Sequence, residues 1–126
     1  MKIKRGYTYK DFGTDTEASV DYPVYASRAA RAVASGECDK GILICGTGIG
    51  MSMVANKYDG VRAALCGDTF SARMTREHNN ANILTMGQRV IGQGLALDIV
   101  NIWLNTEFEG GRHQRRIDQI MEIENS

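Results

Sequence analysis

GILICGTGIG, residues 41–50, is the stretch that decides the fold of this chain. Its apolar first half ends in Cys45 and breaks at once into the glycine-rich segment 46–50, and a helical pattern follows over 51–57. We therefore predict a buried strand, a glycine turn and a helix N-terminus, with the thiol of Cys45 and the hydroxyl of Thr47 at the corner. Free N–H groups and the positive end of a helix dipole favour an anion there, and they favour the thiolate form of a cysteine.

Strand and helix patterns alternate along the rest of the sequence. Strands are predicted at 6–12, 40–45, 61–66 and 82–86, the first followed by a polar loop at 14–21. Helices are predicted at 25–34 with Pro23 at the start, 49–57, 69–78 behind a cap at Asp68 or Thr69, 95–104 and 112–124. Strands separated by helices predict an α/β fold with a parallel sheet, and the length fits a single domain over 1–126.

Composition excludes several classes of protein. The 15 basic residues balance the 15 acidic ones, so no strong field favours nucleic acid or an anionic membrane. The N-terminus lacks the apolar core of a signal peptide, and no apolar run is long enough to span a membrane. The three cysteines, Cys38, Cys45 and Cys66, lack metal-ligand spacing. We expect a cytoplasmic protein with reduced thiols, no structural metal and no cofactor.

The glycine turn also has a nucleotide-binding interpretation. Gly46 and Gly48 begin like the dinucleotide fingerprint, and Asp68 lies where a ribose-binding acid would follow. The third glycine, Gly50, comes one position early, however, and Met51 stands where the fingerprint needs glycine. The turn is therefore weak evidence for a nucleotide when it is taken alone.

Two further clusters contain side chains that could bind an anion or transfer a proton. Arg112, His113, Arg115 and Arg116 crowd the first turns of a predicted helix, where the dipole disfavours cations. Arg112 and Arg116 share a helix face and could grip a phosphate, although a solvated basic patch or a salt bridge to a partner subunit explains them equally well. His78 is either a helix C-cap or part of a polar pocket wall, and Arg89 is by default a surface residue.

Six motifs in order resemble the ribose-5-phosphate isomerase B family, which also contains the galactose-6-phosphate isomerase subunits. The motifs are DFGT at 11–14, VDYP at 20–23, GILICGTGIG at 41–50, REHN at 76–79, GQRV at 87–90 and EGGRHQ at 109–114. The resemblance extends from Gly6 over essentially the whole chain. It implies a Rossmann-like three-layer α/β/α sandwich and a homodimer, often paired into tetramers, with active sites between subunits.

The resemblance also assigns roles to residues of this chain. Cys45 would be the base that moves a proton between C2 and C1 of an open-chain sugar phosphate, and Thr47 with the amides of 46–50 would hold the enediolate oxygens. His78 would assist ring opening beside Asn79. The expected contacts with the sugar are Gly46, Gly48, Ile49, Gly50 and Tyr22, and those with the phosphate are Arg89, Arg112, Arg116 and His113. His113 could also share ring opening. The group around His78 would come from the neighbouring subunit.

The chain departs from the family's pattern at its beginning. Family members begin with a strand that ends in an Asp-His pair and a helix that leads to the segment starting here near Lys4. If the chain is a truncated form rather than one with a misplaced start, we expect weaker phosphate binding and poorer folding, because a central strand edge would be exposed.

The leading hypothesis is an isomerase of ribose 5-phosphate and ribulose 5-phosphate that uses Cys45 as its base and needs no metal. An isomerase of a tetrose or hexose phosphate, a non-catalytic phosphosugar-binding subunit and a nucleotide-binding module are the alternatives. The intact set of Cys45, Thr47 and His78 argues against the non-catalytic subunit, and Met51 argues against the nucleotide module.

Overall fold

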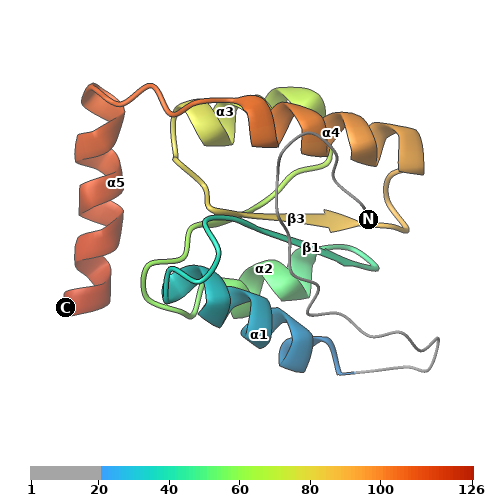
Figure 1. Ribbon diagram of the computed structural model, residues 1–126, viewed down its shortest axis with the longest axis horizontal. Coiled ribbons are helices and arrows are strands. Elements are labelled where there is room, and N and C mark those ends of the chain that lie inside the picture. The colour runs from blue at the N-terminus through green and yellow to red at the C-terminus, as the bar shows by residue number, and fades with distance from the viewer. Residues whose placement is uncertain (1–20) are drawn as a thin grey trace.

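Three parallel strands lie at the centre of the molecule, and they are arranged in the order β1-β3-β2 (Figure 1). The computed structural model describes residues 21–126, so the strand predicted at 6–12 and the loop predicted at 14–21 lie outside the described residues except for Asp21. The strands are β1 (Gly41–Cys45), β2 (Ala63–Leu65) and β3 (Ile83–Gly87). Every residue of β3 is buried, as its central place in the order requires.

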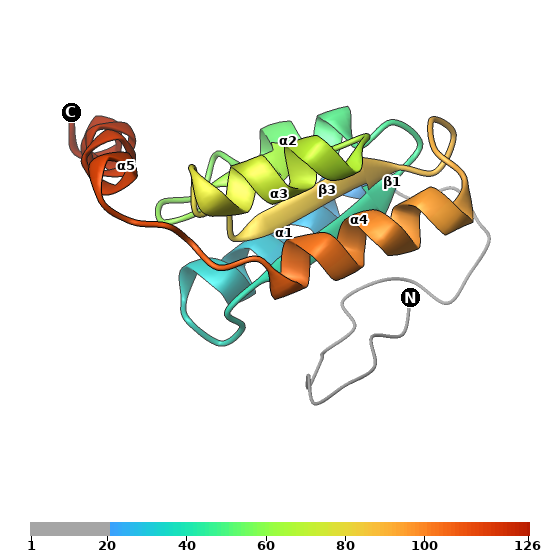
Figure 2. The same ribbon diagram turned by 90° about the horizontal axis from the view of Figure 1, so that it is seen from above.

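Helices cover both faces of this sheet, which confirms the predicted three-layer α/β/α sandwich (Figures 1 and 2). On one face pack α1 (Tyr22–Ala34) and α2 (Ile49–Ala55), and on the other face pack α3 (Thr69–Glu77) and α4 (Gln93–Asn105). The last helix, α5 (Arg112–Glu122), continues into the short 3-10 helix η1 (Ile123–Asn125) and lies beyond the end of the sheet that is opposite to the arrowheads (Figure 1).

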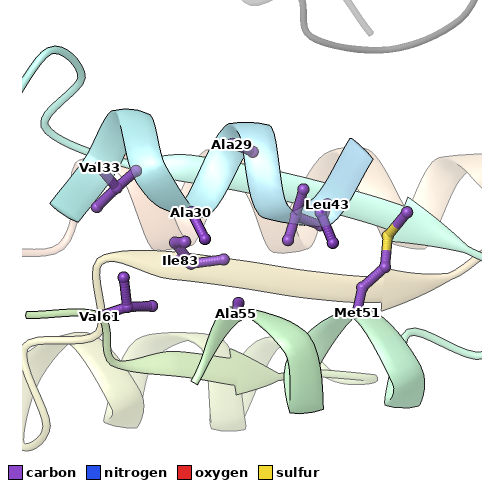
Figure 3. Close-up of a cluster of buried hydrophobic side chains, with 9 residues drawn as sticks. Ala29, Ala30, Val33, Leu43, Met51, Ala55, Val61 and Ile83 are labelled. Atoms are coloured by element: carbon purple, nitrogen blue, oxygen red, sulfur yellow. The ribbon is translucent and has the colours of Figure 1, made fainter. Parts of the chain in front are cut away.

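Each face of the sheet has its own apolar core. Figure 3 shows Leu43 and Ile83 of the sheet packed against α1 and α2, with Met51 and Val61 closing the ends of the cluster. On the other face Trp103 and Ile99 of α4 pack with Leu84 and Met86 of β3. The alternation of buried side chains along β3 between the two clusters is what holds both helical layers to one sheet.

The predicted elements are confirmed in type and order from residue 22 onward, with shifted ends. Helix α1 begins at Tyr22, three residues before the prediction, because Pro23 fits the first helical turn, where no N–H donor is needed. Strand β2 is shorter than predicted, because the side-chain oxygen of Asn82 accepts the N–H of Arg62 at 2.7 Å in place of a strand partner. The predicted cap at Asp68 is confirmed, because its carboxylate accepts the N–H of Ser71 at 2.6 Å.

The register of the strands defines two edges of the sheet on which functional side chains lie. Gly41 is opposite Ile83, and Cys45 is opposite Gly87. The turns after Cys45 and Gly87 therefore share the carboxyl edge, whereas the segment before Ile83 lies at the amino edge. No helix in the part of the chain described by the structure is long and apolar enough to cross a membrane.

Candidate functional site

The corner predicted at the end of β1 is present at the carboxyl edge. Cys45 ends the strand, Gly48 precedes α2 with a φ of +82°, and the half-buried sulfur of Cys45 accepts the N–H of Gly48 at 3.1 Å. The hydroxyl oxygen of Thr47 accepts the N–H of Ile49 at 3.2 Å, and Thr47 is exposed. The thiol therefore lies beside the N–H of Gly48 at the start of α2, where backbone N–H groups can stabilise negative charge that develops on a substrate oxygen.

Two other predicted residues lie against this corner. The backbone N–H groups of Gln88 and Arg89 donate to the carbonyls of Cys45 and Gly46 at 2.8 and 3.0 Å, and a Cβ on Gly46 would lie 3.6 Å from Cδ of Arg89. The phenol of Tyr22 lies against Gly50, where a Cβ would meet its ring and hydroxyl. The carboxyl edge thus brings together Tyr22, Cys45, Thr47 and Arg89, with the amides of 46–50 between them.

A second group of side chains lies at the amino edge. His78 is the C-cap of α3, and its ring stacks on that of His113 in α5, with centroids 4.2 Å apart and an angle of 15° between the planes. Oε1 of Glu109 lies 3.6 Å from Nε2 of both rings. His113 is buried, whereas Glu109 is half exposed, so the group opens to solvent on the side of the carboxylate.

Burial and the neighbouring charges together lower the pKa of His113. Burial of the ring is the main cause that lowers the pKa of His113, followed by the charges of His78, Arg112 and Arg116, while Glu109 opposes them. Arg112 and Arg116 therefore act on the ring from α5, and both are exposed. The neighbouring Asn79 is exposed as well. The amino edge thus gathers Asn79, His113 and the two arginines around His78.

The predicted site residues consequently separate into two half-sites, the corner around Cys45 at the carboxyl edge and the group around His78 at the amino edge. Arg89 lies with the first half-site and is apart from Arg112 and Arg116, which lie with the second. The two edges are separated by the length of β1, which is about 13 Å at roughly 3.3 Å per residue. Direct proton transfer needs an approach of about 3 Å. One sugar carbon therefore cannot contact Cys45 and His78 of the same chain.

Sequence reasoning missed two residues of the second half-site. One is Glu109, which lies in the loop before α5, and its place in the EGGRHQ motif at 109–114 is the signal that could have found it. The other is Arg76, which is 6% exposed and donates to the carbonyls of Ala81 and Thr106 at 2.7 and 3.2 Å. Arg76 joins the two loops that carry Asn79 and Glu109, a role that depends on tertiary burial and leaves no mark in the local pattern.

The geometry also bears on whether the second half-site holds a metal ion. One ligand atom each of His78, Glu109 and His113 lies within 4.8 Å of the others, a set that zinc accepts. A metal bound to both imidazoles lies close to the plane of each ring, however, and the two planes are nearly parallel and stacked. The rings would have to turn apart to share an ion, so the observed arrangement suits proton transfer better than metal binding.

The environments of the thiols predict different reactivities toward an alkylating agent. Burial, followed by the charge of Asp68, raises the pKa of Cys66 to about 11, so Cys66 stays protonated at neutral pH as well as inaccessible. Iodoacetamide at pH 7.5 should therefore label half-buried Cys45 well before Cys66, as peptide mass spectrometry would measure over time. Equal labelling of both thiols in the folded protein would contradict the assignment of Cys45 as the accessible nucleophile.

Known proteins resemble this chain over nearly its full length. The family model described as Ribose/Galactose Isomerase matches residues 1–120. Ribose-5-phosphate isomerase B of Escherichia coli (strain K12) is 51% identical over 122 residues, which cover 97% of this chain and 82% of that protein. D-erythrulose-4-phosphate isomerase of Pectobacterium atrosepticum is 46% identical over 118 residues, which cover 93% of this chain and 78% of that protein.

A solved structure agrees with the sequence comparison. Ribose-5-phosphate isomerase B of Clostridium thermocellum superposes with a TM-score of 0.93 at 58% identity, covering 95% of this chain and 81% of that chain. The chain belongs to the ribose/galactose isomerase family.

Proposed function

We propose that this isomerase interconverts ribose 5-phosphate and ribulose 5-phosphate through an enediolate, with Cys45 as the base. The observation that carries the proposal is the thiol at the end of β1, whose sulfur accepts the N–H of Gly48 in the glycine turn before α2. The family membership and the relatives named for ribose-5-phosphate isomerase support the same substrate.

The chemistry follows from the groups at the carboxyl edge. The thiolate of Cys45 takes the proton from C2 of the open-chain aldose, the C–H electrons form the C1–C2 double bond, and the carbonyl oxygen on C1 becomes an anion. The hydroxyl of Thr47 and the amides of 46–50 stabilise that charge. Transfer of the O2 proton to O1, formation of the C2=O2 double bond and return of the proton from Cys45 to C1 give the ketose, so the reaction needs no redox partner.

The complete active site forms between two copies of the chain in this proposal. A single copy holds its two half-sites on opposite edges of the sheet, whereas a pair related by a two-fold axis can place the carboxyl edge of one against the amino edge of the other. Arg112, Arg116 and Arg89 then converge on the phosphate, and Tyr22 and Asn79 line the sugar. The free thiols of Cys38, Cys45 and Cys66 fit a reducing cytoplasm.

A tetrose phosphate is the second candidate substrate. The relative from Pectobacterium atrosepticum that is named a D-erythrulose-4-phosphate isomerase is 46% identical to this chain, only slightly less than the relative from Escherichia coli. The base and the oxyanion contacts serve either sugar, since both isomerise at C1 and C2. Comparison of kcat/KM for ribose 5-phosphate with that for erythrose 4-phosphate separates the two candidates.

Mixing two inactive variants tests the shared site. Cys45→Ala and His78→Ala should each lose most activity, but a mixed dimer would contain one intact site and one site with both changes. Random pairing makes about half of the dimers mixed, so the mixture should recover about one quarter of the wild-type rate in a ribulose 5-phosphate assay.

A matched mixture provides the control. Cys45→Ala with Thr47→Ala alters the same half-site in both copies, so mixing should add nothing to the rate of Thr47→Ala alone. Native mass spectrometry would establish that subunits have exchanged. Mixed dimers of Cys45→Ala and His78→Ala that recover no activity would contradict a site shared between copies.

A further inference from the structure

Glu109 lies between the two histidines of the second half-site, and the proposed roles of Cys45 and His78 leave it unassigned. Its Oε1 is 3.6 Å from Nε2 of His78 and 3.6 Å from Nε2 of His113, although these histidines come from different helices. This distance is longer than a hydrogen bond and short enough for an ion pair, as is common for catalytic groups before substrate binds.

The backbone fixes the carboxylate in this place. The N–H of Glu109 donates to the carbonyl of Glu77 at 3.1 Å, which ties the residue to the end of α3 directly before His78. Arg76 holds the same two segments together through its bonds to the carbonyls of Ala81 and Thr106. Glu109 is therefore aligned with His78 by main-chain contacts and does not depend on a flexible side chain alone.

The charges around the stacked rings bear on the role of the Glu109 carboxylate. The charges of His78, Arg112 and Arg116 help to lower the pKa of His113, and the carboxylate of Glu109, at ion-pair distance from both rings, opposes them. The pKa of His113 is lowered mainly by burial, so at neutral pH an uncharged ring is stacked on that of His78. His113 then serves as a neutral stacking surface for that ring.

A furanose phosphate needs such a proton donor before the isomerisation step. In ring opening the C1–O4 bond breaks, O4 gains a proton, and O1 loses one as it becomes the aldehyde oxygen. We propose that Glu109 is a positioning residue for ring opening, which orients the His78 ring as the proton donor to O4. The inference rests on the proposed function, because it assumes a cyclic aldose phosphate as substrate.

The experiment separates ring opening from proton transfer at carbon. Ribulose 5-phosphate cannot close a five-membered ring, because its carbonyl is at C2 and the hydroxyl on C5 carries the phosphate. Uptake of deuterium from D₂O at its C1, followed by NMR, therefore reports enediolate formation by Cys45 alone. Conversion of ribose 5-phosphate, which is mainly cyclic, requires ring opening as well.

Glu109→Gln keeps the shape and removes the charge. We expect its kcat for ribose 5-phosphate to fall about tenfold to a hundredfold, at or below the lower end of the roughly hundredfold to ten-thousandfold contribution of general acid–base catalysis, because Glu109 acts through His78, while deuterium uptake changes less than about threefold. Glu109→Asp, which keeps the charge, should recover part of the loss. Glu107→Gln, an exposed carboxylate two residues away, should behave like the wild type, and EDTA in all assays excludes inhibition by a metal bound to the histidines.

The outcomes are distinguishable. Normal conversion by Glu109→Gln, or an equal fall in conversion and in deuterium uptake, would overturn the positioning role and leave the proposed function intact. A wild-type protein that shows neither conversion nor deuterium uptake would overturn the proposed function, and the inference would fall with it.

Discussion

Replacing Cys45 by serine should lower kcat for ribose 5-phosphate isomerisation at least about a thousandfold, with little effect on folding. A serine hydroxyl still accepts the N–H of Gly48, but it ionises far less readily than a thiol and is a poor base without a partner. The N–H of Gly48 therefore cannot restore the missing base. Formation of ribulose 5-phosphate is the measurement, and thermal unfolding confirms that the variant is folded.

A second cysteine provides the matched control. Cys38 is also half-buried and packs against the core formed by α1 and α2, and neither half-site includes it. Cys38→Ser should retain nearly full activity. If Cys45→Ser kept more than about a tenth of the wild-type rate, another residue would have to act as the base, and the proposed mechanism would be wrong.

The corner around Cys45 could be predicted from the sequence because its parts are adjacent in the chain. An apolar run that stops at a cysteine and enters a glycine turn specifies a strand, a turn and a helix start from local rules alone. The structure adds two close approaches, that of Gly87 to Thr47 and that of Tyr22 to Gly50. They depend on how the strands pair and on where α1 packs. Those contacts are tertiary and have no local pattern.

The second half-site could be predicted only in part. The sequence predicts His78 and Arg112 as site residues from their positions near helix ends. The stacking of His78 on His113, however, depends on where α5 returns to the sheet. Arg76 looks like an ordinary surface residue of α3 in the sequence, and its burial is decided by the loops that it joins. The pattern places residues on elements, and the packing of those elements decides which side chains meet.

Gly48 is under two structural constraints in the corner around Cys45. Its φ of +82° lies in the left-handed region, and a Cβ there would be 2.6 Å from Cδ1 of Leu65 and 2.8 Å from the backbone carbon of Met86. Gly48→Ala therefore combines backbone strain with a clash that a side-chain rotation cannot relieve at Met86. We expect it to reduce the free energy of unfolding by about 2–5 kcal/mol. Any folded fraction should lose activity, because the N–H of Gly48 no longer reaches Cys45.

Gly36 separates the strain from the clash. Its φ of +85° is almost the same, but no atom lies within 4 Å of the position of a Cβ. Gly36→Ala should therefore lower the free energy of unfolding by only about 1 kcal/mol and leave kcat unchanged. Urea titration of both variants measures the difference. If Gly48→Ala were no less stable than Gly36→Ala, the turn would be able to move away from β3, and the tight packing of the corner against Met86 would not be what holds Cys45 in place.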